Sequence, residues 1–213
     1  MTAVVAGIGQ TRFARRSGAT EMALAAGAIT AALRDAGLAP RDVDGVVRFD
    51  RDAMWEYDLP GVLSLPALHF YNAVPFGPGS APALLRMAAM AVTQGLATTV
   101  LAFHARDGRV RATPSPALEA ALLARRFGIG EREIAAVTLA HRRAAASNPR
   151  ALVRRLLTAA TRRESAYVAE PLRRVDLAAP AAGACALVVT DEERARSSGR
   201  RPIRILGSLQ AAI

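Results

Sequence analysis

Two residue types that often carry chemistry are scarce in this sequence. Cysteine occurs once, as Cys185, and lysine does not occur, so all 28 basic residues are arginine. A single cysteine excludes an internal disulfide and a metal cluster held by thiolates. Because Cys185 lies in an apolar run without a basic neighbour, the sequence predicts a buried, inert thiol there and not a nucleophile.

Aromatic residues and long apolar runs are also few. Aromatics make up 5% of the chain, and much of its 52% apolar fraction is alanine, a composition that suits helices packed closely on a sheet. No apolar run reaches the roughly 20 residues that span a membrane. The first ten residues lack the basic and then apolar layout of a signal peptide, so we expect a cytoplasmic protein.

Acidic residues are in the minority. The 28 basic and 18 acidic residues give a net charge of +10, part of which reflects the uniform use of arginine in place of lysine. The remaining excess favours an anionic partner, such as a phosphate-bearing cofactor or an acidic protein surface. We do not expect nucleic acid, because the arginines are scattered and no motif that reads nucleic acid is recognisable.

Strand-like and helix-like patterns alternate along much of the chain. The predicted strands comprise residues 3–8, 44–49, 68–74, 98–103, 183–190 and 203–209. The clearest helix is predicted at residues 21–36, because Gly37 follows it and Pro40 lies just beyond. The alternation predicts an α/β fold with a mixed, mostly parallel sheet and helical cover.

The stretch from Phe70 to Arg111 contains the main candidate for chemistry. A turn rich in glycine and proline, residues 76–82, leads into an apolar segment at 81–92 in which Arg86 is the only charge. A helix that is apolar on all sides is a buried helix. Free amide groups at its amino end can hold a carbonyl oxygen, a thioester or a phosphate. The alternative is a packed core helix that binds nothing.

Residues 106–175 predict a helical insert between two strand-bearing parts. The helical patterns in it cover residues 117–127, 131–147, 151–157 and 162–168. They depend on hydrophobic periodicity alone. We therefore divide the chain into a first part of the core at 1–105, the insert at 106–175 and the return strands of the core at 176–213.

Several segments resemble the thiolase superfamily, in particular the sterol-carrier-type thiolases and the thiolase-like lipid-transfer proteins or aldolases of actinobacteria. The matching segments include VVAGIGQTRFARRSG, AALRDAGLAPRDVDGVV, SAPALLRMAAMAVTQGLATTVL and AEPLRRVDLAAPAAGACALVVTDEERA. The resemblance implies a layered fold of two related halves, usually a dimer, of which this chain matches the amino-terminal half. The family's second half, which carries catalytic His and Cys residues, would follow.

The resemblance also shows one departure from the true thiolases. They place a nucleophilic cysteine at the turn before the buried helix, a position that falls on residues 78–80 here, where the sequence is PGS. The acyl-cysteine route is therefore not expected. The loop FHARDGRVR is similar to one in the lipid-transfer branch, which is linked to retro-aldol cleavage of steroid side-chain CoA esters. That reaction needs a base and an enolate stabiliser but no thiol.

Three residues are candidates for catalysis. His104 follows a predicted strand and can act as a base or stabilise an enolate. Asp107 can orient His104 or pair with Arg109, and Ser80, with the amides that follow Gly79, can form an oxyanion hole. The alternative for His104 is a hydrogen-bonded histidine at a strand end. The alternatives for Asp107 and Ser80 are a plain loop turn and a helix cap.

Coenzyme A is the ligand that the resemblance implies, as the thioester of the substrate. The residues proposed to bind it are Gly79, Arg109, Arg142 and Arg143. Arginine binds phosphate well, and Arg142 and Arg143 lie in the insert, which often contacts coenzyme A in the family. A solvated helix end is the alternative for Arg142 and Arg143. No metal is expected.

Three interpretations stay open from the sequence. The first is a thiolase-like protein that cleaves carbon–carbon bonds of lipid or steroid acyl-CoA esters within a larger complex. Its companion is a second copy or an OB-fold, zinc-ribbon protein of the kind that serves the lipid-transfer branch. The second interpretation is a non-catalytic acyl-CoA-binding or scaffolding subunit, and the third is a truncated family member. Half of a two-half fold should expose an apolar face, so we expect the chain to associate.

Overall fold

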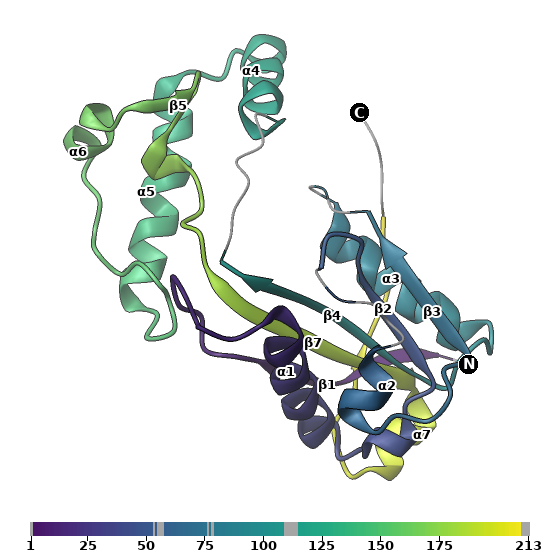
Figure 1. Cartoon of the computed structure of the whole chain (residues 1–213). Helices are drawn as coiled ribbons and strands as arrows, with labels where there is room; N and C mark the ends of the chain where they lie inside the picture. Colours follow the sequence, from purple (N-terminus) through teal and green to yellow (C-terminus); the bar gives the residue numbers. More distant parts are fainter. Residues whose placement is uncertain are drawn as a thin grey trace. The chain divides into compact units, whose positions relative to one another are not determined.

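The computed structural model describes residues 2–52, 54, 58–75, 77, 79–108 and 115–209. The chain forms two compact units. The first comprises Met1–Arg12, Arg16–Asp107 and Ala182–Ile213, and the second comprises Phe13–Arg15 and Gly108–Ala181. Figure 1 shows the elements of both units along the chain.

The first unit has the mixed α/β class that the sequence predicts. Its strands are β1 (Ala3–Gln10), β2 (Gly45–Phe49), β3 (Phe70–Val74), β4 (Thr99–Asp107), β7 (Ala182–Asp191) and β8 (Ile203–Arg204). Its helices are α1 (Glu21–Ala36), α2 (Asp58–Leu63), α3 (Ser80–Thr93) and α7 (Glu192–Ser197), with a 3-10 turn η1 (Pro40–Asp42). The last strand is shorter than the predicted 203–209.

Six strands form one sheet in the order β3-β2-β4-β7-β1-β8. The pairs β2–β3 and β2–β4 are parallel, whereas β4–β7, β1–β7 and β1–β8 are antiparallel. Four of the six strands, β3, β2, β4 and β1, therefore run in the same direction, which confirms a mixed, mostly parallel sheet. The carboxyl ends of β2, β3 and β4 meet at one edge, which is where open α/β sheets usually bind ligands.

Helix α1 has the bounds that the sequence predicts because both of its ends are capped locally. The Thr20 hydroxyl accepts a hydrogen bond from the Ala23 amide at 3.2 Å. Gly37 ends the helix in the left-handed region at φ 69°, and its amide donates to the Arg34 carbonyl. The capped helix then lies along β1, β4 and β7.

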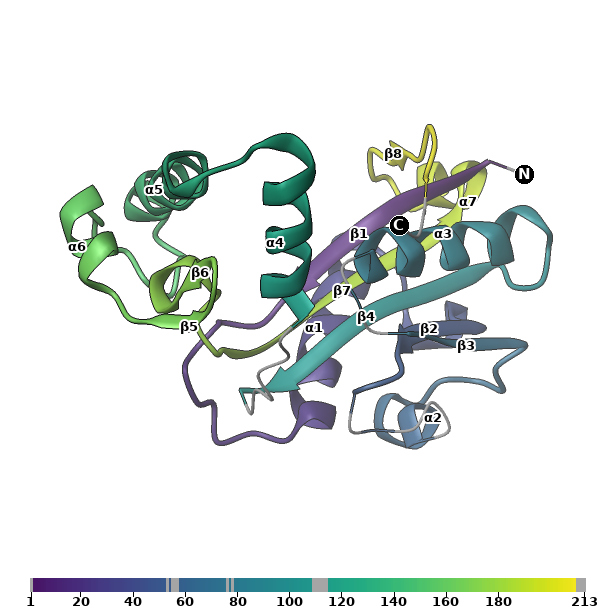
Figure 2. The same ribbon diagram turned by 90° about the horizontal axis from the view of Figure 1, so that it is seen from above.

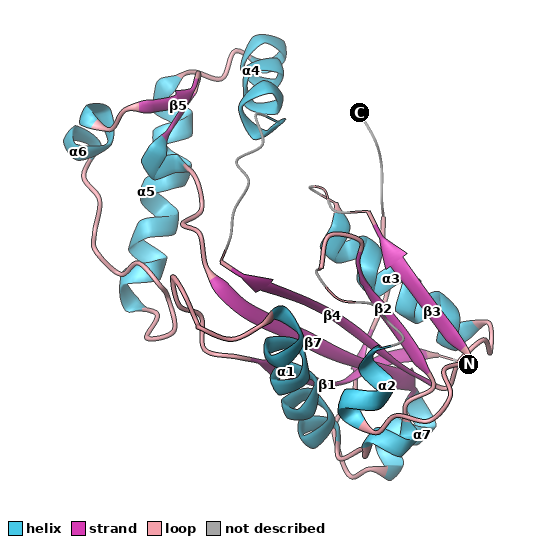
Figure 3. Ribbon diagram, in the orientation of Figure 1, coloured by secondary structure: helices cyan, strands magenta, loops and turns pink. Residues whose placement is uncertain are grey.

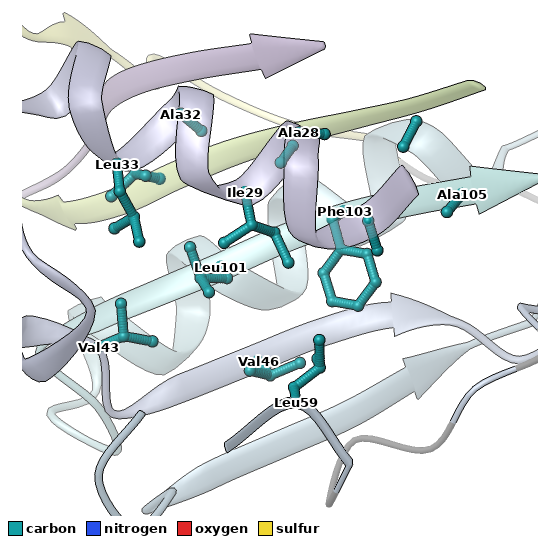
Figure 4. Packing of buried hydrophobic residues seen from close by; sticks show 14 of the residues in the cluster. Ala28, Ile29, Ala32, Leu33, Val43, Val46, Leu59, Leu101, Phe103 and Ala105 are labelled. Carbon is teal, nitrogen blue, oxygen red and sulfur yellow. The ribbon is translucent and has the colours of Figure 1, made fainter. Parts of the chain in front are cut away.

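Side chains of the sheet alternate between two hydrophobic cores, one on each face. On the α1 face, Ile29 and Leu33 pack over Leu101 and Phe103 of β4, as Figure 4 shows. On the opposite face, the intervening β4 residue Ala102 belongs to the core that includes α3. Figure 2 shows α1 and α3 on opposite sides of β4 and β7.

Helix α3 is confirmed close to its predicted position, but only one of its sides is buried. Ala88 and Val92 are fully buried against the sheet, whereas Arg86 and Met90 are exposed on the outward side. The prediction of burial on all sides therefore holds only for the side that faces the sheet. The outward side is an apolar surface in the chain as it stands.

The second unit is mostly helical. It contains α4 (Ser115–Phe127), α5 (Glu131–Ser147), α6 (Ala159–Glu164), the antiparallel pair β5 (Tyr167–Ala169) and β6 (Leu172–Arg173), and the 3-10 turn η2 (Arg174–Asp176). Figure 3 distinguishes this hairpin from the helices. The helix predicted at 151–157 is wrong, because Thr158 is the extended N-cap of α6 and the helix begins only after it. The helix predicted at 162–168 ends at Glu164.

A buried arginine holds the second unit together. The Arg162 side chain is fully buried and donates to both carboxylate oxygens of Asp176, at 2.7 and 2.8 Å, and to Glu131 at 2.6 Å. Asp176 also accepts from the Thr138 hydroxyl at 2.7 Å and from the Arg173 amide at 2.8 Å. One guanidinium therefore ties α5, α6 and η2 to each other, a task that its planar fork of donors suits.

Candidate functional site

The edge at the carboxyl ends of the parallel strands brings a histidine and a carboxylate together. His104, near the end of β4, has its Nδ1 atom 2.6 Å from Oδ1 of Asp52, which lies three residues after β2. The Phe49 ring packs against the imidazole with the centroids 4.5 Å apart. Because β2 and β4 are neighbours, the loop after β2 reaches the side chain at the end of β4.

This contact indicates which tautomer the His104 ring adopts. A carboxylate accepts hydrogen bonds, so Nδ1–H donates to Asp52 and Nε2 is the ring nitrogen that carries the lone pair. The Asp52 side chain is completely buried, whereas 28% of the His104 side chain is exposed. The pair can therefore take up a proton at Nε2, with the buried carboxylate balancing the imidazolium charge.

The second oxygen of Asp52 is unusual. Oδ2 is buried and has no hydrogen-bond partner among the described residues. Buried polar atoms in native proteins are almost always paired, so an exception points to a role other than stability. Because Asp52 contacts His104, we infer that its role is to act on that histidine.

The predicted orienting contact of Asp107 is made instead by Asp52. Asp107 is the last residue of β4, and side chains three positions apart on a strand point to opposite faces. Its amide donates to the Glu21 carboxylate at 3.2 Å. The available signal for Asp52 was its place three residues after a predicted buried strand, where we considered no acidic residue.

Ser80 is engaged in the turn before α3. Its buried hydroxyl accepts a hydrogen bond from the Gly77 amide and lies 2.7 Å from the carbonyl oxygens of Pro75 and Gly77. The Ser80 amide donates to the Gly77 carbonyl, and Pro82 has no amide hydrogen. The Ser80 hydroxyl is therefore engaged within the turn, and it does not cap the helix, because the N-cap position is Gly79 and has no side-chain cap hydrogen bond.

Gly79 is one of the residues predicted to bind coenzyme A. Gly79 has an ordinary φ of −92°, and a Cβ atom built on it would meet no atom within 4 Å, so its backbone does not require glycine. Arg109 lies outside the described residues, as do Phe76 and Pro78 of the predicted turn.

The only cysteine is exposed, contrary to the prediction that it is buried. Cys185 lies on β7, directly opposite His104 in the antiparallel pair. Desolvation by neighbouring atoms raises the pKa of its thiol above the ordinary value. The raised pKa favours the neutral thiol near pH 7, and the absence of nucleophilic chemistry at Cys185 stays a prediction.

A pocket of about 600 Å³ lies within the second unit. Its polar lining includes His141 and Arg142 of α5 and Arg150, and its apolar lining includes Val137 and Leu152. Arg142 is half-buried and has no ion-pair partner among the described residues. The pocket thus joins free positive charge to an apolar wall, which suits a phosphate attached to an apolar or aromatic group.

Arg143, the other arginine predicted to bind a phosphate, does not line this pocket and is exposed. Among the described residues, no three His, Cys, Asp or Glu side chains are grouped so as to hold a metal ion. None of the described helices has the length and apolar character needed to cross a membrane.

Two curated relatives match nearly all of this chain, whereas no protein-family model does. A 17-hydroxy-3-oxo-4-pregnene-20-carboxyl-CoA lyase of Mycobacterium tuberculosis is 35% identical over 98% of this chain and 62% of its own length. A steroid side-chain-cleaving aldolase of Thermomonospora curvata is 34% identical over 99% of this chain and 62% of its own length. The chain therefore spans less than two thirds of these relatives.

Solved structures similar to this chain include an aldolase and a thiolase-like protein. The structure described as an Ltp2-ChsH2(DUF35) aldolase has a TM-score of 0.88 and 33% identity, and this chain covers 60% of it. An SCP2-thiolase-like protein type 1 from Mycobacterium smegmatis, with 22% identity and a TM-score of 0.71, shows the fold alone. The chain therefore has a thiolase-like fold, and over nearly all of its own length it is similar to proteins described as steroid side-chain-cleaving aldolases.

Proposed function

We propose that this chain takes part in retro-aldol cleavage of a lipid or steroid acyl-CoA ester, within a larger assembly. The observation that carries the proposal is the His104–Asp52 pair, which lies at the carboxyl-end edge of a thiolase-like sheet. The sequence FGPGS before α3 supplies no cysteine nucleophile. A base without a nucleophilic thiol suits proton-transfer chemistry better than acyl transfer.

The substrate class follows from the chemistry of the relatives' substrate. The name of the Mycobacterium tuberculosis lyase describes a steroid with a 17-hydroxyl group and a 20-carboxyl-CoA thioester. The hydroxyl is therefore β to the thioester carbonyl, as a retro-aldol step requires. Loss of the hydroxyl proton breaks the C17–C20 bond, and the electron pair passes to the thioester as an enolate. The enolate then takes a proton at C20, which leaves a 17-ketone and a shortened acyl-CoA.

His104 would supply the base for this reaction. Its Nε2 atom accepts the hydroxyl proton, and the buried Asp52 carboxylate holds the ring in the required tautomer. General base catalysis of this kind contributes about 10²- to 10⁴-fold to a rate. Asp107, the other residue that we predicted for catalysis, stays a candidate for contact with the substrate at the same end of β4.

Coenzyme A would bind in the pocket of the second unit. Arg142 and Arg150 offer charge-assisted hydrogen bonds to phosphate, and Val137 and Leu152 offer an apolar wall for the adenine ring. Gly79, Arg109 and Arg143 stay predictions for the same ligand. The double substitution Arg142→Ala with Arg150→Ala should weaken coenzyme A binding, most strongly at low salt. Arg132→Ala, an exposed arginine of the same helix that does not line the pocket, is the matched control, and equal affinity in the double variant would reject this placement.

We also propose that the chain works in an assembly with a second copy or another protein. Large apolar side chains are exposed on the outward side of α3 and along α4, among them Met90, Leu118, Leu122 and Phe127. Soluble monomers rarely leave such surfaces bare. One solved relative is an aldolase complex of two named components, which makes a protein partner the leading choice. A strict monomer at high concentration, by light scattering, would contradict association.

The second candidate function is a non-catalytic acyl-CoA-binding subunit. It is favoured by Ser80, whose hydroxyl is already engaged in its own turn and does not serve as an oxyanion donor. In that case the pocket of the second unit would bind the ester without turnover. This function predicts retained coenzyme A affinity and no product in any assembly.

The deciding experiment is a product assay with 17-hydroxy-3-oxo-4-pregnene-20-carboxyl-CoA, for the chain alone and with its partner. We expect His104→Gln to lower kcat at least about 100-fold, because the base is lost. His69→Gln is the matched control, since His69 also lies near a carboxylate, 3.8 Å from Asp44, but is 70% exposed. An unchanged rate in His104→Gln would reject the base, and binding without turnover would favour the scaffold function.

A further inference from the structure

Three neighbouring strands place three polar side chains in one row. In the β4–β7 pair His104 lies directly opposite Cys185, and in the β1–β7 pair Cys185 lies directly opposite Gln10. Directly opposite residues on antiparallel strands point to the same face, with Cβ atoms about 4.5–5.5 Å apart. The row His104–Cys185–Gln10 thus crosses β4, β7 and β1 on one face of the sheet.

The alternating neighbours of the row identify this face. Phe103 and Ala184 belong to the core under α1, so His104 and Cys185 point to the other side. On β1, a Cβ atom at Gly9 would lie 2.1 Å from the Ala28 carbonyl oxygen of α1, so Gln10 also points away from α1. The row therefore lies on the face that α3 partly covers.

The core under α3 stops before it reaches the row. Ala102 on β4 is the last buried residue before His104 on this face, and Leu187 on β7 is only partly buried. Cys185 and Gln10 are both exposed, and Ile8 beside them is 61% exposed. The row is therefore a solvent-exposed polar strip on the sheet, and the apolar core under α3 lies next to it.

We propose that Gln10 and Cys185, together with His104, form the floor of one binding site for the acyl part of a β-hydroxyacyl thioester. This inference depends on the proposed function. The side-chain amide of Gln10 is a hydrogen-bond donor for the thioester or enolate oxygen, a role that Ser80 cannot fill because its hydroxyl is engaged in the turn. Cys185 contributes a compact neutral surface between the donor and the base.

A second observation indicates a ligand here and not merely a polar strip. The Asp52 side chain is completely buried, contacts His104 and keeps one oxygen without a partner among the described residues. Burial of a carboxylate with an unpaired oxygen costs free energy, so its presence here indicates a functional role for the group that it contacts, His104. That group is one end of the row.

The test uses Cys185 as a built-in reporter, since it is the only cysteine of the chain. Iodoacetamide forms a carbon–sulfur bond with the thiol as iodide and the thiol proton leave, and intact mass measures the rate. We expect saturating 17-hydroxy-3-oxo-4-pregnene-20-carboxyl-CoA to slow alkylation at least about tenfold, because the acyl group covers the sulfur. Coenzyme A alone should have little effect, since it lacks the acyl group.

A matched control separates local cover from a general change in reactivity. In a Cys185→Ser background, Leu206→Cys places the thiol at a position that is 94% exposed and outside the row. Its alkylation rate should not respond to the ester. If the ester binds, as judged by calorimetry, while Cys185 reacts at its free rate, the row is not the acyl site, although the proposed function can still stand. If the ester does not bind, both proposals fail.

A second measurement tests the donor role of Gln10. We expect Gln10→Ala to lower kcat by about 10²-fold with a much smaller change in KM, because a donor to the enolate acts mainly in the transition state. Gln94→Ala is the matched control, since Gln94 is exposed at the other end of α3. A higher KM at unchanged kcat would overturn the donor role.

Discussion

Replacement of Arg162 by methionine should destabilise the second unit selectively. Methionine has a similar length and is apolar, so the substitution removes charge and hydrogen bonds while it leaves little empty space. The Asp176 side chain, which is 2% exposed, would lose two charge-assisted hydrogen bonds from Arg162. It would keep only the Thr138 hydroxyl and the Arg173 amide.

The size of the effect follows from the burial of both partners. Loss of one member of a buried ion pair costs about 3–5 kcal/mol, because the other charge stays desolvated without compensation. Removal of both charges should cost less, so Arg162→Met with Asp176→Leu should regain part of the loss. The matched control is Arg163→Met on the same helix, which is exposed and should change stability by less than about 0.5 kcal/mol.

Hydrogen exchange followed by mass spectrometry resolves the two units in one experiment. A loss of 3–5 kcal/mol corresponds to acceleration of exchange by about 100- to 4000-fold, at 1.4 kcal/mol for each factor of ten. The acceleration should appear in peptides from α5 and α6 and be absent from β4 and β7. Equal acceleration in both units, or a change below about fivefold in α5, would refute this reasoning about Arg162.

Three further predictions concern the described residues. Burial would raise the pKa of Asp176, but hydrogen bonds from its arginine and threonine partners outweigh it and lower the pKa. Its contribution to the stability of the second unit is therefore complete above the ordinary aspartate pKa of about 3.9 and is lost as the pH falls through the lowered value. Asp176→Asn should flatten acid unfolding in that range. The pKa of Glu192 should be about 2 by NMR titration, with hydrogen bonds from Arg204 as the main cause, so Arg204→Ala should raise it. Gly9→Ala should destabilise the first unit by about 1–3 kcal/mol or more in urea, because the new Cβ would overlap the backbone of α1. Gly61→Ala, with nothing within 4 Å of the new atom, should be neutral or stabilising, and equal losses in the two variants would contradict the steric argument.

The bounds of two helices could be predicted from local sequence signals at their ends. Helix α1 begins after Thr20 and ends before Gly37, as its sequence predicts, because both caps are made within a few residues. Helix α5 likewise has its predicted bounds, Glu131–Ser147. The segment 151–157 has a helical composition but no regular structure, since periodicity over seven residues does not outweigh tertiary context.

Only one residue of the His104–Asp52 pair could be predicted from the sequence. His104 stood out by its type and its place after a strand, whereas its partner Asp52 lies 52 positions earlier in the chain. Their contact depends on β2 and β4 being neighbours, which no local pattern encodes. The exposure of Cys185 was missed for a related reason. An apolar strand reads as buried on both faces, but α3 covers only part of one face.

The close approach of α1 to β1 also bears on how glycines should be interpreted in chains of this kind. Gly7 and Gly9 both lack the positive φ angles that usually explain a glycine, yet each would place a Cβ atom within 2.5 Å of the helix backbone. A saturation library of this protein should therefore reject even alanine at both positions, while a dihedral survey would pass over them. The backbones of β1 and α1 are in direct contact there. We therefore expect β1 and α1 to unfold together as one cooperative unit.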